Sequence, residues 1–389
     1  MLERVRPLPT ETVETGEALG RVLGADVVGA DDVPPFDNSA MDGFAVRAAD
    51  TAGASDAAPV SLALADESRA GRPATRSLRA GEAIRISTGA VIPDGADAVV
   101  RVEDTNDRGD TVAVKVAVPV GKEIRRAGDD IRAGERVLER GTRVGPAELG
   151  VLASVGAAAV ECSLRPAVAV IATGDELVSP GRPLAPGQIR NTNVYSVPAQ
   201  ALGAGAEVSS AVTVGDDHDA TVAAVAHGLD ADALVLSGGV SVGEHDHVKD
   251  ALAEHGVEQV FWGVALRPGH PTWFGMRGST FVFGLPGNPV SAMVTFHLFV
   301  RPALLALAGA AQLRRRATAV IDEPYAKRPG RAHVVRCTLE ARDDGWHVRP
   351  TKAQGSHVLT SMLGAQAFAL LEMERGDVAE GERVEIELL

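Results

Sequence analysis

The sequence predicts a multidomain protein of class α/β plus β, built around a doubly wound parallel sheet. In the middle and third quarter of the chain, strand-length apolar runs alternate with helix-like stretches. On both sides of this region, short β-branched runs are separated by loops rich in Gly and Pro, which is typical of small β domains. The length of 389 residues argues for two to four domains, at about 150 residues per domain. The hydrophobic content of 45% excludes wholesale disorder.

Two separate stretches, residues 1–30 and 135–165, are expected to form a discontinuous N-terminal domain, domain I. Thr10 or Thr12 is able to cap a helix in the run that follows them. A second helical segment is expected at residues 146–155, packed beside the first helix. This packing would join the two stretches into one domain.

Residues 31–134 are expected to form a β-rich domain II, inserted into domain I. The segment is rich in Gly, Pro and Asp and carries short β-branched runs such as 83–86 and 98–102. Residues 313–389 return to short strand-like runs. They predict a small C-terminal β-barrel, domain IV.

Residues 166–312 are expected to form the doubly wound α/β domain, domain III. The predicted strands are 167–172, 208–214, 233–236 and 280–283, and the predicted helices are 194–202, 219–229, 247–254 and 289–307. Strands that alternate with helices favour a mainly parallel sheet covered on both faces.

Charge and composition exclude several classes of protein. A formal net charge of −14 argues against a general nucleic-acid binder or a binder of anionic membranes. Two cysteines are too few for a disulfide scaffold or a cysteine-based zinc site. The N-terminus lacks an apolar core of signal-peptide length, and His297, Arg301 and Pro302 interrupt the most apolar stretch, 289–309. We therefore expect no membrane span, no nucleic-acid partner and a cytoplasmic location.

Three predicted strands of domain III end in Gly-rich polar loops, at residues 172–176, 237–241 and 284–289. In open α/β sheets ligands bind outside the carboxyl ends of the strands, so the three loops should border one crevice. In the last loop Asn288 is suited to cap a helix that begins at Pro289, whose positive end would face an anion. Each loop alone is equally well explained as an ordinary strand–helix turn, whereas the three together favour a ligand site.

The crevice is not expected to bind a dinucleotide or the NTP of a P-loop protein, because there is no G-x-G-x-x-G fingerprint after the first strand and no P-loop motif. The crevice offers the carboxylates Asp175, Glu176, Asp216, Glu244 and Asp246. Carboxylates beside loops that bind anions fit Mg²⁺ bridging them to a phosphate. Any one of these acids is also explained as a helix cap or a solvated charge.

Two histidines, His245 and His247, flank Asp246 and raise the alternative of a zinc site. No cysteine lies nearby and the H-E-x-x-H spacing is absent, which argues against zinc.

Basic side chains indicate an oxyanion site. Arg267, in a turn after a predicted strand, is suited to a bidentate contact, and His270 to assist when protonated. A second basic and hydroxyl set follows near the C-terminus. It consists of Arg331, Arg336, Ser356 and His357, which alone would be interpreted as surface charges.

Taken together, segments spread over nearly the whole chain resemble the molybdopterin molybdenumtransferases of the MoeA type, which include the E domain of gephyrin. The matching segments, in order, are PPFDNSAMDGFAVRAAD (34–50), RISTGAVIPDGADAVV (85–100), RRAGDDI (125–131), ATGDELVSPG (172–181), GQIRNTN (187–193), SGGVSVGEHD (237–246), RPGHP (267–271), GLPGNPVSA (284–292) and QGSHVLTSM (354–362). The first and eighth segments are highly specific.

The resemblance implies a four-domain elongated chain that works as a homodimer. Each active site would pair domain III of one chain with domain II of the other. The implied activity inserts molybdate into adenylylated molybdopterin with Mg²⁺, releasing AMP and the molybdenum cofactor. Domain III would resemble the molybdopterin adenylyltransferases. One such adenylyltransferase and the molybdoenzymes that accept the cofactor are the implied partners.

The resemblance and the loops together define the candidate site residues. The candidate catalytic residues are Asp42, Thr88, Asp130, Glu176 and Asp246, and the candidate Mg²⁺ ligands are Glu176, Asp216 and Asp246. The candidate substrate-binding residues are Thr173, Gly174, Asp175, Ser237, Gly238, Gly239, Ser241, Arg267, His270, Pro286, Gly287, Asn288, Pro289, Ser291, Arg331, Arg336 and Ser356. Many relatives carry lysines where this chain has Gly263, Arg267 and His270, so its molybdate affinity and its choice between molybdate and tungstate stay open.

Two other functions are consistent with parts of the sequence. A molybdopterin adenylyltransferase that uses ATP would share domain III but would lack residues 1–165 and 313–389. A scaffold role, as in receptor clustering by gephyrin, would use the same fold to bind a peptide. No fused second domain is present to favour that role.

Overall fold

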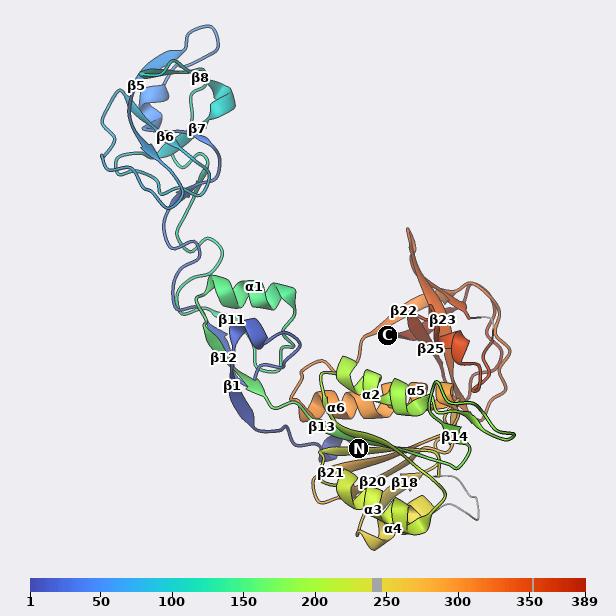
Figure 1. Ribbon diagram of the computed structural model, residues 1–389. Helices are drawn as coiled ribbons and strands as arrows, with labels where there is room; N and C mark the ends of the chain where they lie inside the picture. The colour runs from blue at the N-terminus through green and yellow to red at the C-terminus, as the bar shows by residue number, and fades with distance from the viewer. Residues whose placement is uncertain (240–246, 352) are drawn as a thin grey trace.

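The computed structural model describes residues 1–239, 247–351 and 353–389. Figure 1 shows an elongated chain: a β-rich domain lies at one end, a small domain containing α1 lies in the middle, and the α/β and C-terminal β domains lie together at the other end. The polypeptide passes through the middle domain twice, once on the way to the β-rich domain and once on the way back.

The middle domain is held together by strand pairing between its two stretches. β1 (Thr10–Glu14) pairs antiparallel with β12 (Ala159–Ser163), and β2 (Val27–Val28) pairs antiparallel with β11 (Arg136–Leu138). The helix α1 (Pro146–Ser154) lies where the sequence predicts one.

The prediction of a helix capped by Thr10 or Thr12 is wrong. Residues 10–14 form the strand β1, and the helical part that follows is one short 3-10 turn, η2 (Thr15–Glu17). β-branched side chains at positions 10, 12 and 13 favour a strand, and a partner strand far along the chain stabilises it. α1 therefore packs beside η2 and not beside a second α-helix.

The β-rich domain contains a six-stranded mixed sheet in the order β7-β4-β6-β5-β9-β8. Its strands are β4 (Gly43–Val46), β5 (Val60–Ser68), β6 (Glu82–Ile86), β7 (Ala98–Arg101), β8 (Thr105–Asp107) and β9 (Thr111–Val114). A short pair, β3 (Asn38–Ser39) with β10 (Ile124–Arg125), lies where the chain enters and leaves the domain. The runs predicted as strands at 83–86 and 98–102 fall in β6 and β7.

The α/β domain is built on a six-stranded sheet in the order β16-β13-β17-β21-β20-β18. β16 (Glu207–Val214), β13 (Ala167–Thr173), β17 (Ala233–Ser237) and β21 (Thr280–Leu285) are parallel, and β20 (Trp273–Arg277) and β18 (Glu258–Trp262) add an antiparallel edge. A short parallel pair, β14 (Leu177–Val178) with β15 (Ile189–Arg190), lies beside the sheet. All four predicted strands are confirmed, and together they are the parallel part of the sheet.

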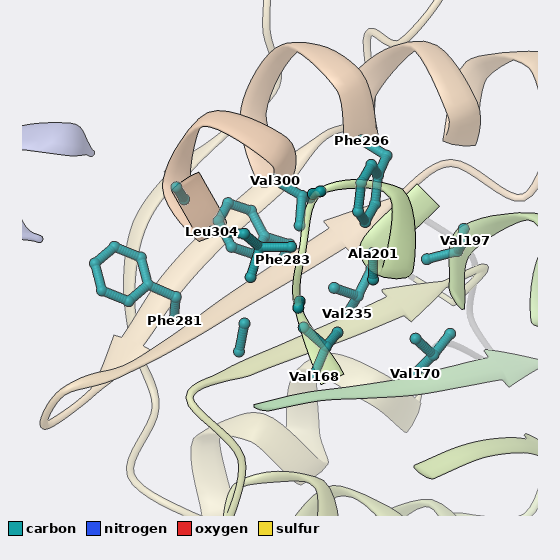
Figure 2. Close-up of a cluster of buried hydrophobic side chains, with 14 of the residues drawn as sticks. Val168, Val170, Val197, Ala201, Val235, Phe281, Phe283, Phe296, Val300 and Leu304 are labelled. Carbon is teal, nitrogen blue, oxygen red and sulfur yellow. The ribbon is translucent and has the colours of Figure 1, made fainter. Parts of the chain in front are cut away.

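Helices cover both faces of this sheet (Figure 1). One face carries α2 (Asn193–Gly203) and a long helix made of α5 (Pro289–Thr295), a π-helical turn (Phe296–Val300) and α6 (Arg301–Leu307). The other face carries α3 (His218–Gly228) and α4 (His247–Glu254). Figure 2 shows Val168, Val170 and Val235 of the sheet facing Ala201 and Val300 of the helices. The core of the domain lies between these layers.

The helix at residues 289–307 has the length and apolarity to cross a membrane by composition alone. In the protein, 78% of its most apolar window is buried. Phe296, Val300 and Leu304 contribute to the core of the α/β domain (Figure 2). Packing against the sheet therefore explains why this helix is apolar on several sides.

The C-terminal domain is a closed five-stranded β-barrel. Its strands are β22 (Arg316–Ile321), β23 (Ala332–Arg342), β24 (Gly345–Pro350), β25 (Ala367–Leu371) and β26 (Arg383–Leu388). Pairing of β23 with both β24 and β25 closes the barrel. One short strand of the α/β segment, β19 (Leu266–Arg267), pairs with β23. This pairing carries Arg267 to the boundary between the two domains.

Candidate functional site

The three Gly-rich loops after β13, β17 and β21 meet in one cavity of about 690 Å³ at the carboxyl edge of the sheet. Predicted residues in its lining are Thr173, Gly174, Glu176, Asp216, Ser237, Gly238, Gly239, Gly287, Asn288 and Pro289. The sequence predicts that these loops border one crevice, and in the structure they do. We call this cavity the loop cavity.

Close packing fixes the shape of these loops. Gly238 has a φ of +90°, and a Cβ atom there would lie 2.8 Å from the backbone oxygen of Thr173. Only glycine fits both the conformation and the space. Within the described residues, the Thr173 hydroxyl oxygen is buried and has no hydrogen-bond partner. Thr173 is also one of the residues that line the cavity.

Asn193, at the start of α2, connects two of the loops. Its Nδ2 donates to Ser237 Oγ at 2.7 Å and to the Gly287 backbone oxygen at 2.8 Å, and its side chain is buried. Asn193 lies in the segment 187–193 but is not among the predicted site residues. No apolar strand leads directly into it, and polar residues at a helix start are usually interpreted as caps.

The predicted acidic residues have different places. Glu176 and Asp216 line the loop cavity. Asp175 is not among the lining residues. Its Oδ1 accepts a hydrogen bond from the Asp216 backbone N–H at 2.9 Å and so stabilises the loop that carries Asp216. Ser241, Glu244, His245 and Asp246 lie outside the described residues. In the ranges 1–239, 247–351 and 353–389, no three His, Cys, Asp or Glu side chains gather as a metal site.

A second cavity, of about 360 Å³, gathers the predicted oxyanion-binding residues. Its lining includes Arg267, His270, Pro286, Asn288, Ser291, Arg331 and Ser356. Asn288 and His357 also line the loop cavity, so the two cavities adjoin there. His357 belongs to the predicted basic and hydroxyl set but is not among the predicted site residues. We call this second cavity the arginine cavity.

Three segments, two from the α/β domain and one from the barrel domain, form the arginine cavity. β19 supplies Arg267, the start of α5 supplies Ser291, and the loop 353–358 of the barrel domain supplies Ser356. The turn at Gly269 packs against α5 so closely that a Cβ atom there would lie 2.4 Å from Thr295 Cγ2. His270 is held by a hydrogen bond between its Nδ1 and the Val264 backbone oxygen, at 2.8 Å.

Asn288 is at the predicted helix-cap position, but its side chain does not cap α5. Its Nδ2 donates to Ser356 Oγ at 3.2 Å, and the Val290 backbone N–H donates to the Ser356 backbone oxygen at 3.2 Å. The cap side chain is thus used to join the α/β domain to the barrel domain. These bonds hold the wall that separates the two cavities.

Arg336, a predicted substrate-binding residue, is not among the residues that line the arginine cavity. Its side chain is 1% exposed and donates to the backbone oxygens of Ala353 (3.2 Å) and Gly355 (3.3 Å). Burial lowers the pKa of its guanidinium from the usual value. Arg336 lies beneath the loop that carries Ser356 and shapes it, whereas Arg331 is the barrel arginine that lines the cavity.

The predicted residues of the β-rich domain form their own group. Asp42 Oδ1 accepts from the Thr88 backbone N–H at 2.7 Å and from Thr88 Oγ1 at 3.0 Å. These two hydrogen bonds, the backbone one first, lower the pKa of Asp42. Asp130 follows β10 at the entrance to the same domain. Within one chain this domain lies far from the loop cavity (Figure 1), so the structure does not bring these residues to it.

Family models match almost all of the chain. The model of the MoeA N-terminal region (domain I and II) matches residues 1–156, a probable molybdopterin binding domain matches residues 169–306, and the MoeA C-terminal region (domain IV) matches residues 318–389. A molybdopterin molybdenumtransferase of Haemophilus influenzae is 38% identical over all of this chain and 96% of its own. The chain belongs to the molybdopterin molybdenumtransferase family.

Other relatives agree. Molybdopterin molybdenumtransferase 2 of Mycobacterium tuberculosis is 43% identical over 87% of this chain and 81% of its own. The crystal structure of a molybdopterin biosynthesis moeA protein from Pyrococcus horikoshii matches with a TM-score of 0.84 and 30% identity, covering 100% of this chain and 97% of that one. This chain is therefore a transferase of molybdenum cofactor biosynthesis.

Asn193→Ala is expected to lower the free energy of unfolding by about 1–3 kcal/mol, because it leaves Ser237 and a buried backbone oxygen without their partner. Urea denaturation measures this change. Asn106→Ala, at an exposed position in β8, is the matched control and should leave stability nearly unchanged. Equal losses in the two variants would contradict the assigned link between the loops.

Proposed function

We propose that adenylylated molybdopterin occupies the loop cavity and molybdate the arginine cavity, so that metal insertion takes place where the two adjoin. The single observation that carries this proposal is that Asn288 and His357 line both cavities. Glycine loops that expose backbone N–H groups suit the phosphates of the adenylylated pterin. The arginines of the second cavity suit a dianionic oxyanion.

In this proposal, the charge of each side chain that lines the two cavities determines its role. Arg267 and Arg331 neutralise molybdate and hold it by charge-assisted hydrogen bonds, and the Ser356 hydroxyl adds a neutral donor. The Thr173 hydroxyl and the loop N–H groups orient the pyrophosphate in the loop cavity. Water attacks the phosphoanhydride, so that AMP leaves and molybdopterin keeps its terminal phosphate. The two dithiolene thiols bind molybdenum, and their two protons leave with one molybdate oxygen as water, so that molybdenum does not change its oxidation state. No protein nucleophile is needed for this exchange.

Mg²⁺ is part of the proposal. Carboxylate oxygens beside a phosphate are the donors that this hard cation prefers. Glu176 and Asp216 line the loop cavity and would hold it, together with Asp246, which is outside the described residues. Bound there, Mg²⁺ would polarise the pyrophosphate and neutralise its charge.

The exposed group of Asp42, Thr88 and Asp130 supports a homodimer with a shared site. Asp42 and Thr88 pair with each other at the surface of a domain that extends away from the loop cavity of its own chain (Figure 1). In a two-fold dimer, that domain would reach the loop cavity of the second chain. A molybdopterin adenylyltransferase would supply the substrate, and molybdoenzymes would accept the product.

The function is tested by incubating the purified protein with adenylylated molybdopterin, Mg²⁺ and molybdate, then adding a molybdoenzyme that lacks its cofactor. We expect the acceptor enzyme to become active only when molybdate is present. An adenylyltransferase would instead consume ATP and molybdopterin. Acceptor activity that stays at background would refute the proposal.

Chelation of Mg²⁺ is expected to stop AMP release, because the carboxylates of the loop cavity then face the pyrophosphate without a bridging cation. AMP is measured by chromatography before EDTA, after EDTA and after excess Mg²⁺ is restored. Adding excess Ca²⁺ in place of Mg²⁺ is the control that shows whether any divalent cation restores AMP release. AMP release that continues unchanged in EDTA would remove Mg²⁺ from the mechanism.

A further inference from the structure

A cavity of about 700 Å³ lies away from both cavities of the proposed active site, at the junction between the middle domain and the end of α6. One wall comes from residues 141–148 and the other from residues 301–315. Four arginines line it: Arg143 from the middle domain, and Arg301, Arg314 and Arg315 from the segment that leads into the barrel domain. We call it the junction cavity.

Carboxylates do not balance these arginines. Glu148 lines the junction cavity, but its Oε2 accepts from the Gly145 backbone N–H at 2.8 Å and so stabilises the start of α1. Glu387 is fully buried and lies 3.3 Å from Arg314 Nη1, yet it also lies 3.5 Å from Arg316 and 3.2 Å from His297. One carboxylate is thus shared by three basic side chains.

The other three arginines contact only neutral groups in the part of the chain that the structure describes. Arg301 Nη1 donates to the Leu313 backbone oxygen at 3.2 Å, and Arg143 Nη2 donates to the Gly203 backbone oxygen at 3.2 Å. The exposed guanidinium of Arg315 makes no hydrogen bond or ion pair there. Each of these groups therefore keeps N–H donors for a further acceptor, since a guanidinium carries five.

The arginines also act on one another. Burial lowers the pKa of Arg301, and the charges of Arg143, Arg315 and Arg314 lower it further, whereas Glu387 raises it. This is a local excess of positive charge in a chain whose formal net charge is −14. An anion in the cavity would relieve that repulsion and accept the free donors at once.

We propose that the junction cavity binds a tetrahedral oxyanion dianion of the phosphate class, held between Arg143 on one wall and Arg301 and Arg315 on the other. The two walls already meet where the Ala311 backbone N–H donates to the Gly141 backbone oxygen at 2.9 Å. A dianion that bridges them adds bonds across the same junction. It braces the point from which the middle and β-rich domains extend away from the α/β domain (Figure 1).

Inorganic phosphate tests this proposal through its effect on thermal unfolding of the full-length protein, at constant ionic strength set with chloride. Phosphate that binds the native state raises the melting temperature, and at a given concentration tighter binding raises it more. All proteins carry Arg267→Ala, so that binding in the arginine cavity does not contribute. In that background, Arg143→Gln with Arg315→Gln should weaken phosphate by roughly ten- to a hundredfold, as expected for lost charged hydrogen bonds.

Controls keep the result specific. Arg277→Gln, at an exposed arginine of β20, should leave the phosphate response unchanged. Arg315→Gln alone removes an exposed side chain and serves if the double variant does not fold. Molybdate titrated in the same way should also raise the melting temperature, and the junction variants should lose that response too, since the site as proposed binds either tetrahedral dianion. In addition, phosphate should slow hydrogen exchange in residues 141–148 and 310–315.

A phosphate response that is equal in the junction variants and the Arg277→Gln control would overturn the proposal. So would the absence of any response in the Arg267→Ala background, or unchanged exchange in both walls when phosphate is bound. A response to phosphate that the junction variants lose, with protection of both walls, supports it.

Discussion

Mixing two inactive variants is expected to restore about a quarter of wild-type activity. One variant carries Asp42→Ala with Thr88→Ala in the β-rich domain, and the other carries Arg267→Ala with Arg331→Ala in the arginine cavity. If each active site combines the β-rich domain of one chain with the cavities of the other, one site of every heterodimer receives all the lesions and its second site receives none. Random exchange makes about half of the dimers heterodimers, each with one intact site.

A site built inside one chain would give a different result. In that case every site of every dimer would contain a damaged half, and no mixture would gain activity. Native mass spectrometry must show that heterodimers form, and each variant must be nearly inactive alone. Confirmed heterodimers with no regained activity would exclude the shared site, without affecting the assignment of the two cavities.

Arg267→Ala is expected to raise the molybdate concentration needed for half-maximal activity by roughly ten- to a hundredfold. A lost charge-assisted hydrogen bond costs about 1.5–3 kcal/mol, which corresponds to that range. Arg267 lines the arginine cavity and not the loop cavity. The affinity for adenylylated molybdopterin, measured without molybdate, should therefore change much less.

The matched control for this prediction is Arg277→Ala, which removes an exposed arginine of the same domain. Its molybdate dependence should equal that of the wild type. The account of the arginine cavity fails if Arg267→Ala also leaves the molybdate dependence unchanged, or if it weakens the pterin substrate as much as molybdate.

The α/β domain could be predicted from the sequence because its signals are local. β13, β17 and β21 are mainly apolar runs, each followed by a loop that contains glycine. The carboxyl ends of parallel strands meet at one edge, so the loop cavity follows from the order of the elements. The identity of the ligand does not follow from that pattern. It came from the resemblance of the motifs to a family.

The errors arose where distant parts of the chain decide the structure. β1 exists because β12, far along the sequence, pairs with it, and local propensity at residues 10–14 does not reveal that partner. An arginine is usually exposed, and nothing in the local sequence marks Arg336 as buried. The closed barrel and the loop at 353–361 nevertheless bury it. Asn193 was missed for the same reason, since its partners lie in two loops that follow other strands.

The most direct test of the central claim is to measure, in one reaction of the wild-type protein, the AMP released and the molybdenum incorporated into cofactor. The account predicts that both products form in equal amounts and rise together with the molybdate concentration, because the two adjoining cavities couple loss of AMP to insertion of the metal. AMP released without incorporated molybdenum, or cofactor formed without AMP, would contradict it.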